Sequence, residues 1–102
     1  MADFKPTTDG TLTINAEAAS ARAAVRTNAD PNQPVRVLNA GVSIVFIKRG
    51  TVAVTASTND MPIYPGAPPE VIPLEPGDTH IAAATTSTSC KLYLTPGSFV
   101  RG

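Results

Sequence analysis

Residues 35–48 read VRVLNAGVSIVFIK and form the densest apolar stretch of the chain. Two runs rich in β-branched residues flank an Asn-Ala-Gly break, a pattern that predicts a β-hairpin or a tightly bent pair of strands. Residues 44–47 are apolar on both faces of the predicted strand, so both faces need cover. The domain core can cover one face, and a second sheet, a loop or another protein chain must cover the other.

The composition around this stretch predicts one small all-β domain. The chain has 102 residues, with three Phe, two Tyr and no Trp, so its core must be built from aliphatic residues and alanine. Ten prolines and seven glycines are dispersed between short β-branched runs, which is typical of all-β proteins. We therefore expect a single β-sandwich or jelly-roll-like domain, either thin or stabilised by oligomerisation.

The chain divides into three parts by composition. Residues 1–15 are polar and are predicted to be an extended N-terminal arm, in which residues 11–14 can pair as an early edge strand. Residues 16–97 form the predicted β-sandwich domain, and residues 98–102 are a short C-terminal tail. Residues 16–26 have both helix propensity and strand-like alternation; we favour a strand at 20–25, because an alanine helix would bury little.

Prolines, turn residues and alternation predict the strands and turns in the middle of the chain, from residue 51 to residue 84. Residues 51–55 alternate and predict a strand, whereas proline inside 61–64 and 70–74 places those two segments at sheet edges. Pro76 and Gly77 stand in the order that a type II turn prefers. The small residues of 80–84 predict a strand that a neighbouring layer can approach closely.

The last predicted strand has the clearest alternation in the chain. Cys90, Leu92 and Leu94 are expected to face the core, with polar residues between them, and Pro96-Gly97 is expected to end the strand. About seven or eight short strands separated by turns fit a sandwich or jelly roll.

Charge and cysteine content exclude several classes of function. Eight basic and eight acidic residues cancel and form no basic stripe, so we expect no nucleic-acid partner. No run of about 18 apolar residues is present, so no membrane partner is expected. Cys90 is the single cysteine, which excludes an intrachain disulfide and a multi-cysteine zinc site. The N-terminal residues carry no signal-peptide pattern, so we expect synthesis in a cytoplasm.

Two residues could carry chemistry, and we assign both to structure. His80 follows Pro76-Gly77-Asp78, which resembles the Pro-Gly-x-x-His segment of cupin barrels, but the further histidines of a cupin metal site are missing. We therefore expect His80 to begin a strand and to be satisfied by a hydrogen bond. Cys90 is expected to be a core thiol. With no convergent catalytic set in the sequence, we predict no enzyme activity, no cofactor and no metal.

Several segments together resemble a family of phage proteins: residues 35–41, 45–50, 60–67, 77–83 and 92–97. They resemble small virion structural proteins of tailed bacteriophages, namely capsid decoration (cement) proteins or related head accessory proteins. The resemblance covers roughly residues 20 to 97. It implies a protein of the virion that sits on the outer surface of the phage head and is made in the host cytoplasm. The implied partners are the major capsid protein and further copies of the chain, with a homotrimer favoured.

Three other functions are compatible with parts of the sequence. A tail, collar or fibre-attachment component of the virion would share the same structural class. A carbohydrate-binding sandwich module is disfavoured, because Tyr64 and Tyr93 are the only tyrosines and no Trp offers a stacking platform. A degenerate cupin-like enzyme would require bound metal.

We predict an interface along the central apolar strand, its flanking arginines and the arm. Guanidinium groups suit ion pairs between chains, and arm segments can dock by adding a strand to a partner sheet. The predicted interface residues are Leu12, Ile14, Arg36, Val45, Phe46, Ile47 and Arg49. Phe46 or its neighbours should lie at or beneath the contact between subunits.

Overall fold

The computed structural model describes residues 2–7, 10–27, 31–86 and 89–101, and this part of the chain is all-β, with no helix. The predicted all-β class is therefore confirmed. The strands are β1 Ala2–Pro6, β2 Leu12–Ala16, β3 Ala21–Ala24, β4 Pro34–Asn39, β5 Val45–Gly50, β6 Met61–Ile63, β7 Glu70–Pro73, β8 His80–Thr85 and β9 Cys90–Arg101. Residues 1, 8–9, 28–30, 87–88 and 102, which belong to the predicted arm, loops and tail, lie outside the described residues.

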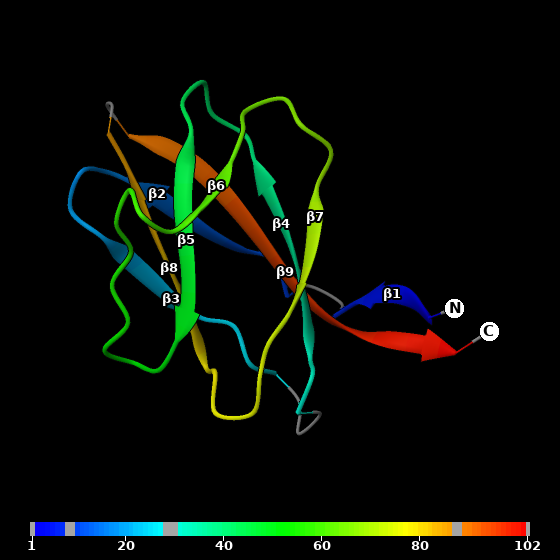
Figure 1. The fold of residues 1–102 in the computed structure, drawn as a ribbon. Helices are drawn as coiled ribbons and strands as arrows, with labels where there is room; N and C mark the ends of the chain where they lie inside the picture. The colour runs from blue at the N-terminus through cyan, green and yellow to red at the C-terminus, as the bar shows by residue number, and fades with distance from the viewer. Residues whose placement is uncertain (1, 8–9, 28–30, 87–88, 102) are drawn as a thin grey trace.

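The strands form two antiparallel sheets (Figure 1). In the larger sheet the order is β1-β9-β4-β7, and β2 also pairs with β9. In the smaller sheet the order is β3-β8-β5-β6. The long strand β9 organises the larger sheet, because β2 and β1 pair along one of its edges and β4 pairs along the other. The described part of the predicted N-terminal arm therefore consists mostly of strands within this sheet.

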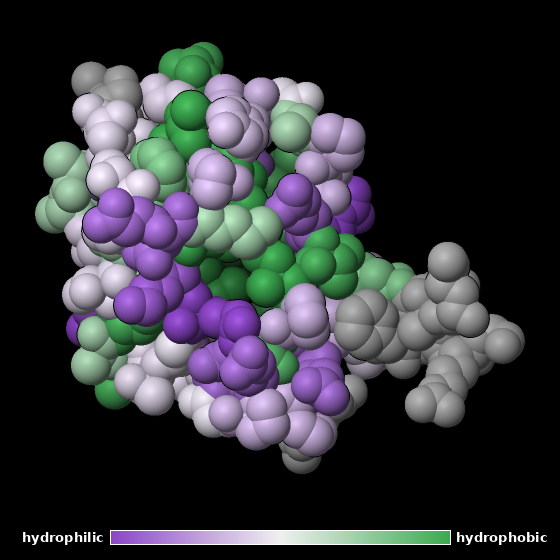
Figure 2. Space-filling model, viewed as in Figure 1, coloured by the Kyte–Doolittle hydropathy of each residue, from purple (hydrophilic) through white to green (hydrophobic). Residues whose placement is uncertain are grey.

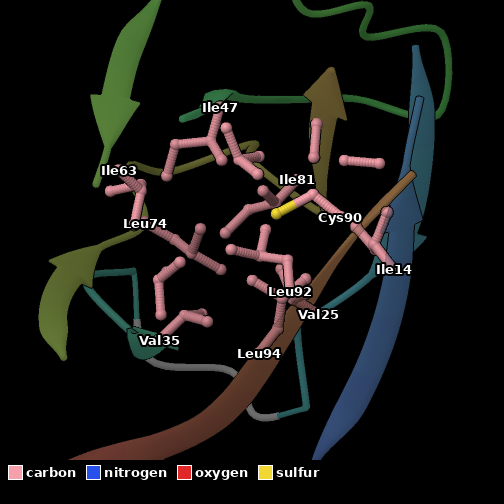
Figure 3. Close-up of a cluster of buried hydrophobic side chains, with 14 residues drawn as sticks. Ile14, Val25, Val35, Ile47, Ile63, Leu74, Ile81, Cys90, Leu92 and Leu94 are labelled. Atoms are coloured by element: carbon pink, nitrogen blue, oxygen red, sulfur yellow. The ribbon is translucent and has the colours of Figure 1, made fainter. Parts of the chain in front are cut away.

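The core lies between the two sheets (Figure 3). The inward alternation predicted for β9 is confirmed, since Cys90, Leu92 and Leu94 are all buried. The other buried members of the cluster are Ile14, Ala16, Val25, Val35, Val37, Val45, Ile47, Ile63, Leu74, Ile81 and Ala83. All are aliphatic or small, as the low aromatic content requires.

The hairpin prediction for residues 35–48 is wrong. β4 belongs to the larger sheet and β5 to the smaller one, so residues 40–44 carry the chain from one sheet to the other. The buried Asn39 explains this corner: its Nδ2 donates to the carbonyls of Ser43 at 2.7 Å and Ile63 at 2.8 Å. Its Oδ1 accepts from the amide of Gly41 at 3.0 Å. The asparagine side chain thus satisfies backbone groups of the corner and of the end of β6.

The strand predicted at residues 51–55 is also absent. Val52 is 64% exposed, and the amide of Val54 closes a turn onto the Thr51 carbonyl at 3.0 Å. Farther along the loop, the amide of Ala56 donates a hydrogen bond to Ser20 Oγ at 2.8 Å, just before β3 of the smaller sheet. This stretch lies over a sheet face instead of along an edge, so it has no strand partner.

The loop of residues 51–60 crosses the outer face of the smaller sheet. It leaves β5 at Gly50, reaches Ser20 just before β3, and returns to β6, so it passes over β8 between them (Figure 1). Ala82 and Ala84 of β8, which point away from the core, are nevertheless buried. This confirms that the small residues of 80–84 allow a close layer. From this burial and the path of the loop, we infer that residues 51–60 cover part of the second face of this sheet.

Most of the remaining local predictions are confirmed. β3 occurs within the favoured segment 20–25, and β6 and β7 are the edge strands of their sheets. The turn at residues 75–78 has Gly77 at φ +93° and a hydrogen bond from the Asp78 amide to the Glu75 carbonyl, as a type II turn requires.

The predicted end of the last strand at Pro96-Gly97 is wrong, since β9 continues to Arg101. Pro96 has no amide hydrogen, but its carbonyl still accepts from the Thr7 amide at 2.8 Å. The missing donor faces Thr7, whose carbonyl accepts instead from the Gly10 amide at 3.1 Å. Among the described residues, no helix is long and apolar enough to cross a membrane.

Candidate binding site

A groove of about 510 Å³ opens at the side of the molecule where the edges of the two sheets meet. It exists because β6 pairs only with Val45 to Ile47, whereas β8 pairs with all six residues of β5. The groove is lined by Ile47, Lys48, Arg49, Asp60, Met61, Ile72, Glu75, Asp78 and Ile81. Figure 2 shows its hydrophobic floor framed by hydrophilic side chains.

The floor of the groove continues the core. Ile47 and Ile81 are buried members of the central cluster, and Ile72 of β7 packs against that cluster. Met61 of β6 is exposed at the rim. An apolar side chain of a ligand would therefore meet mainly Ile72 and Met61, with the buried Ile47 and Ile81 beneath them.

One end of the groove is closed by ion pairs. Arg49 Nη2 lies 3.0 Å from Glu75 Oε1, and Arg49 Nη1 lies 2.8 Å from Asp78 Oδ2. The same Asp78 oxygen accepts from the Glu75 amide at 2.9 Å. Arg49, at the end of β5 in the smaller sheet, is therefore fixed to the turn between β7 and β8.

Arg26 holds the backbone of the same turn. Its Nε donates to the Asp78 carbonyl at 2.6 Å, and its Nη2 donates to the Glu75 carbonyl at 2.9 Å. Arg49 thus pairs with the side-chain carboxylates of the turn, and Arg26 bonds its backbone carbonyls. Such multiple charge-assisted hydrogen bonds fix its position more firmly than a single exposed ion pair would.

Hydrogen bonds to Glu75 and then to Asp78 raise the pKa of Arg49 above its usual value. The guanidinium therefore stays charged wherever the protein is folded at ordinary pH.

Lys48 and Asp60 add one charge of each sign along the groove. An apolar floor with fixed charges at its rim is suited to binding, and the groups along it show no nucleophile beside a base.

The predicted interface residues are distributed over different parts of the fold. Ile14, Val45 and Ile47 are buried in the core, so their side chains act within one copy of the chain. Leu12 packs partly against the core. The exposed or half-buried members are Arg36, Phe46 and Arg49.

Arg36 and Phe46 are not neighbours. Arg36 points outward from the larger sheet, because Val35 and Val37 beside it are buried. Phe46 points outward from the smaller sheet, where it lies opposite Pro62 and Ala84. The two outward faces are on opposite sides of the core, so the predicted residues do not form one continuous patch. Arg49 pairs with carboxylates of its own chain.

His80 and Cys90 have the structural roles expected of them. His80 begins β8, and its Nδ1 lies 2.7 Å from Thr79 Oγ1. The buried Cys90 donates from Sγ to Asn39 Oδ1 at 3.1 Å. In the part of the chain that the structure describes, no three His, Cys, Asp or Glu side chains gather as metal ligands.

A second surface was missed by the sequence analysis. Val42 is 90% exposed and Tyr64 is 56% exposed, and Ile44 is also exposed. Asn39 joins their two segments, because its amide bonds the carbonyls of both Ser43 and Ile63. We call Val42, Ile44 and Tyr64 the apolar tip. The Asn39-Ala40-Gly41 break was the available signal, but it was interpreted as a hairpin turn or as the bend of a strand pair, and neither interpretation indicates an exposed apolar surface.

Comparison with known proteins gives no relative: no family model, no curated protein and no solved structure matches the chain.

Proposed function

We propose that this chain is a structural protein of a tailed-bacteriophage virion that binds the outside of the head shell as a decoration (cement) protein. The proposal rests on the resemblance of residues 20–97 to such proteins. It also includes packing of the two sheets as a jelly-roll-like sandwich. The major capsid protein is the proposed partner, and the outer surface of the head is the proposed location.

The apolar tip is the observation that supports this function best. Val42 is almost fully exposed, yet the loop that carries it is held by a buried, fully bonded asparagine. A rigid apolar projection loses little conformational entropy when it docks, so it is suited to a pocket on another protein. We assign the tip to the contact with the shell.

Repetition over the shell would make this small surface effective. The tip offers three apolar side chains, which alone would bind weakly. Copies that also contact one another on a symmetric lattice gain avidity, because binding of one copy raises the effective concentration of the next. The near-zero net charge of the chain adds little repulsion between neighbouring copies.

Self-association, with a trimer favoured, is part of the proposal, and Phe46 is its proposed contact. Phe46 is the outward-facing member of the central strand, and it is half-buried between Pro62 of β6 and Ala84 of β8. Replacing Phe46 with Asp should dissociate the trimer while the monomer stays folded. An unchanged oligomer would place the contact elsewhere.

Binding of purified chain to heads of the phage that encodes it tests the shell contact. Val42→Asp should abolish co-sedimentation with heads, because a charge in an apolar contact is costly to desolvate. Val52→Asp is the matched control, since Val52 is an exposed valine beyond the opposite end of β5. Equal binding by both variants, or absence of the protein from purified heads, would refute the proposal.

A further inference from the structure

The two ends of the chain form a ribbon that projects from the body of the protein (Figure 1). β1 pairs antiparallel with the last residues of β9, from Ala2 opposite Arg101 to Pro6 opposite Gly97. The pairing of β4 with β9 ends at Pro96, before this ribbon begins. β1 stands at the end of the sheet order, so its outer edge has no strand partner among the described residues.

The direction of the backbone groups along β1 follows from one hydrogen bond. The amide of Thr7 donates to the Pro96 carbonyl, so Thr7 faces β9. Because backbone groups alternate along an antiparallel strand, Asp3 and Lys5 also face β9, whereas Ala2, Phe4 and Pro6 present theirs at the outer edge. Pro6 therefore stands where its missing N–H takes nothing from the pairing with β9.

The sequence of this edge is complementary to itself. β1 reads Ala-Asp-Phe-Lys-Pro. In an antiparallel pair centred on Phe4, each Asp3 stands opposite the Lys5 of the second copy, and each Ala2 stands opposite Pro6. The two Phe4 residues exchange both backbone hydrogen bonds, and each Ala2 amide meets a Pro6 carbonyl, which is still an acceptor. Opposite charges and aromatic residues at facing positions stabilise antiparallel pairs.

We propose that the outer edge of β1 binds a second copy of this chain through two-fold antiparallel pairing centred on Phe4. The pairing joins two ribbons into one sheet with the strand order β9-β1-β1-β9. A two-stranded ribbon alone is only marginally stable in water, and added strands stabilise it. The contact is isologous and closes after two copies, so it does not propagate into a fibre. The proposal goes beyond the virion role and does not depend on it.

Lysine and proline at an edge can instead prevent pairing with other chains. That alternative makes an opposite prediction for the charges. If Lys5 only blocks association, its replacement by a negative residue opposite Asp3 would not matter, and the wild-type chain would be a monomer. The two explanations are therefore separated by changing the charges at positions 3 and 5 while keeping the strand.

Sedimentation equilibrium and native mass spectrometry of the full chain test the pairing. The wild type should contain an assembly of twice 10.5 kDa, or a larger assembly with an even number of copies if the Phe46 contact also forms. Lys5→Asp and Asp3→Lys each put like charges opposite each other and should raise the dissociation constant about tenfold or more. The double variant Asp3→Lys/Lys5→Asp restores opposite charges and should restore association.

A parallel measurement in the Phe46→Asp background separates this contact from the proposed trimer contact. The two-copy assembly should persist in that background, and it should still dissociate on Lys5→Asp. Unchanged circular dichroism and thermal unfolding of each variant would show that the body remains folded. A strict monomer, an assembly of three copies alone, or association indifferent to the charges at positions 3 and 5 would overturn the proposal. None of these outcomes depends on whether the protein binds phage heads.

Discussion

Two connections in this protein are held by opposite kinds of chemistry. At the corner of residues 39–44, the neutral and buried Asn39 bonds the backbone of both neighbouring segments. At the turn of residues 75–78, the charged side chains of Arg49, Glu75 and Asp78 meet near the surface. Both arrangements fix an irregular segment relative to the smaller sheet, but water has access to only one of them.

The difference in burial determines which connection matters more for stability. Removing a buried polar side chain leaves its partners without hydrogen bonds, and they cannot turn to water. Removing an exposed ion pair lets each partner regain hydration, so the measured loss is small. We therefore expect the corner to dominate stability, even though the turn contains the more conspicuous charges.

The largest effect is expected for Asn39→Ala. The change leaves the Ile63 carbonyl and the Gly41 amide without their partner, and it leaves the Ser43 carbonyl with only the longer bond from Cys90 Sγ at 3.4 Å. We expect a loss of about 2–4 kcal/mol in the free energy of unfolding. Urea denaturation would measure it. Asn15→Ala, at an exposed position of β2, is the control and should change stability by less than about 0.5 kcal/mol. Similar losses for both variants would remove the proposed advantage of the buried corner.

The next effect concerns the close approach of Gly41 to Cys90. A Cβ at position 41 would overlap Cys90 Sγ, so Gly41→Ala should destabilise by about 1–3 kcal/mol. Cys90→Ala removes the overlapping sulfur, although the remaining contacts to Cys90 stay tight. The double variant should therefore be more stable than the sum of the single effects predicts. Strict additivity in a double-mutant cycle would show that the contact is relieved in some other way.

This corner also shows how far the sequence could predict the fold. Alternation located the core residues of β9, and prolines located the edge strands β6 and β7, because both signals act within a few residues. The Asn39-Ala40-Gly41 break is equally compatible with a hairpin and with a passage between sheets. Which of the two forms depends on Ile63, which is distant in sequence and whose carbonyl accepts a hydrogen bond from the side-chain amide of Asn39.

The candidate site was less predictable for the same reason. Arg49 could be singled out, but its partners Glu75 and Asp78 lie across a turn that joins other strands. Residues 51–55 alternate like a strand, but the hydrogen bond from the Ala56 amide to Ser20 Oγ ties this loop to the segment before β3. Contacts between distant segments carry no local sequence pattern, so neither arrangement could be predicted.

A smaller effect is expected at the exposed turn. Arg49→Met removes both ion pairs while keeping an unbranched side chain, and it should destabilise by about 0.5–1 kcal/mol. Arg36→Met is the matched control, because Arg36 is an exposed strand arginine with no ion pair among the described residues. The difference between the two variants should shrink in about 1 M NaCl, since salt screens exposed charges. A difference as large as that for Asn39→Ala would contradict the comparison between the two connections.

The smallest expected effect is the pH dependence of that ion-pair contribution. The pKa of Arg49 is raised by Glu75 and then by Asp78, so the folded chain holds this proton more tightly than the unfolded chain. The resulting stabilisation is fully present below the unfolded pKa of arginine and is lost only as the pH rises through the higher folded value. The difference in stability between wild type and Arg49→Met should therefore stay constant between about pH 6 and pH 9. Urea midpoints across that range would test it, and a difference that vanished by pH 9 would mean that a group other than Arg49 controls the turn.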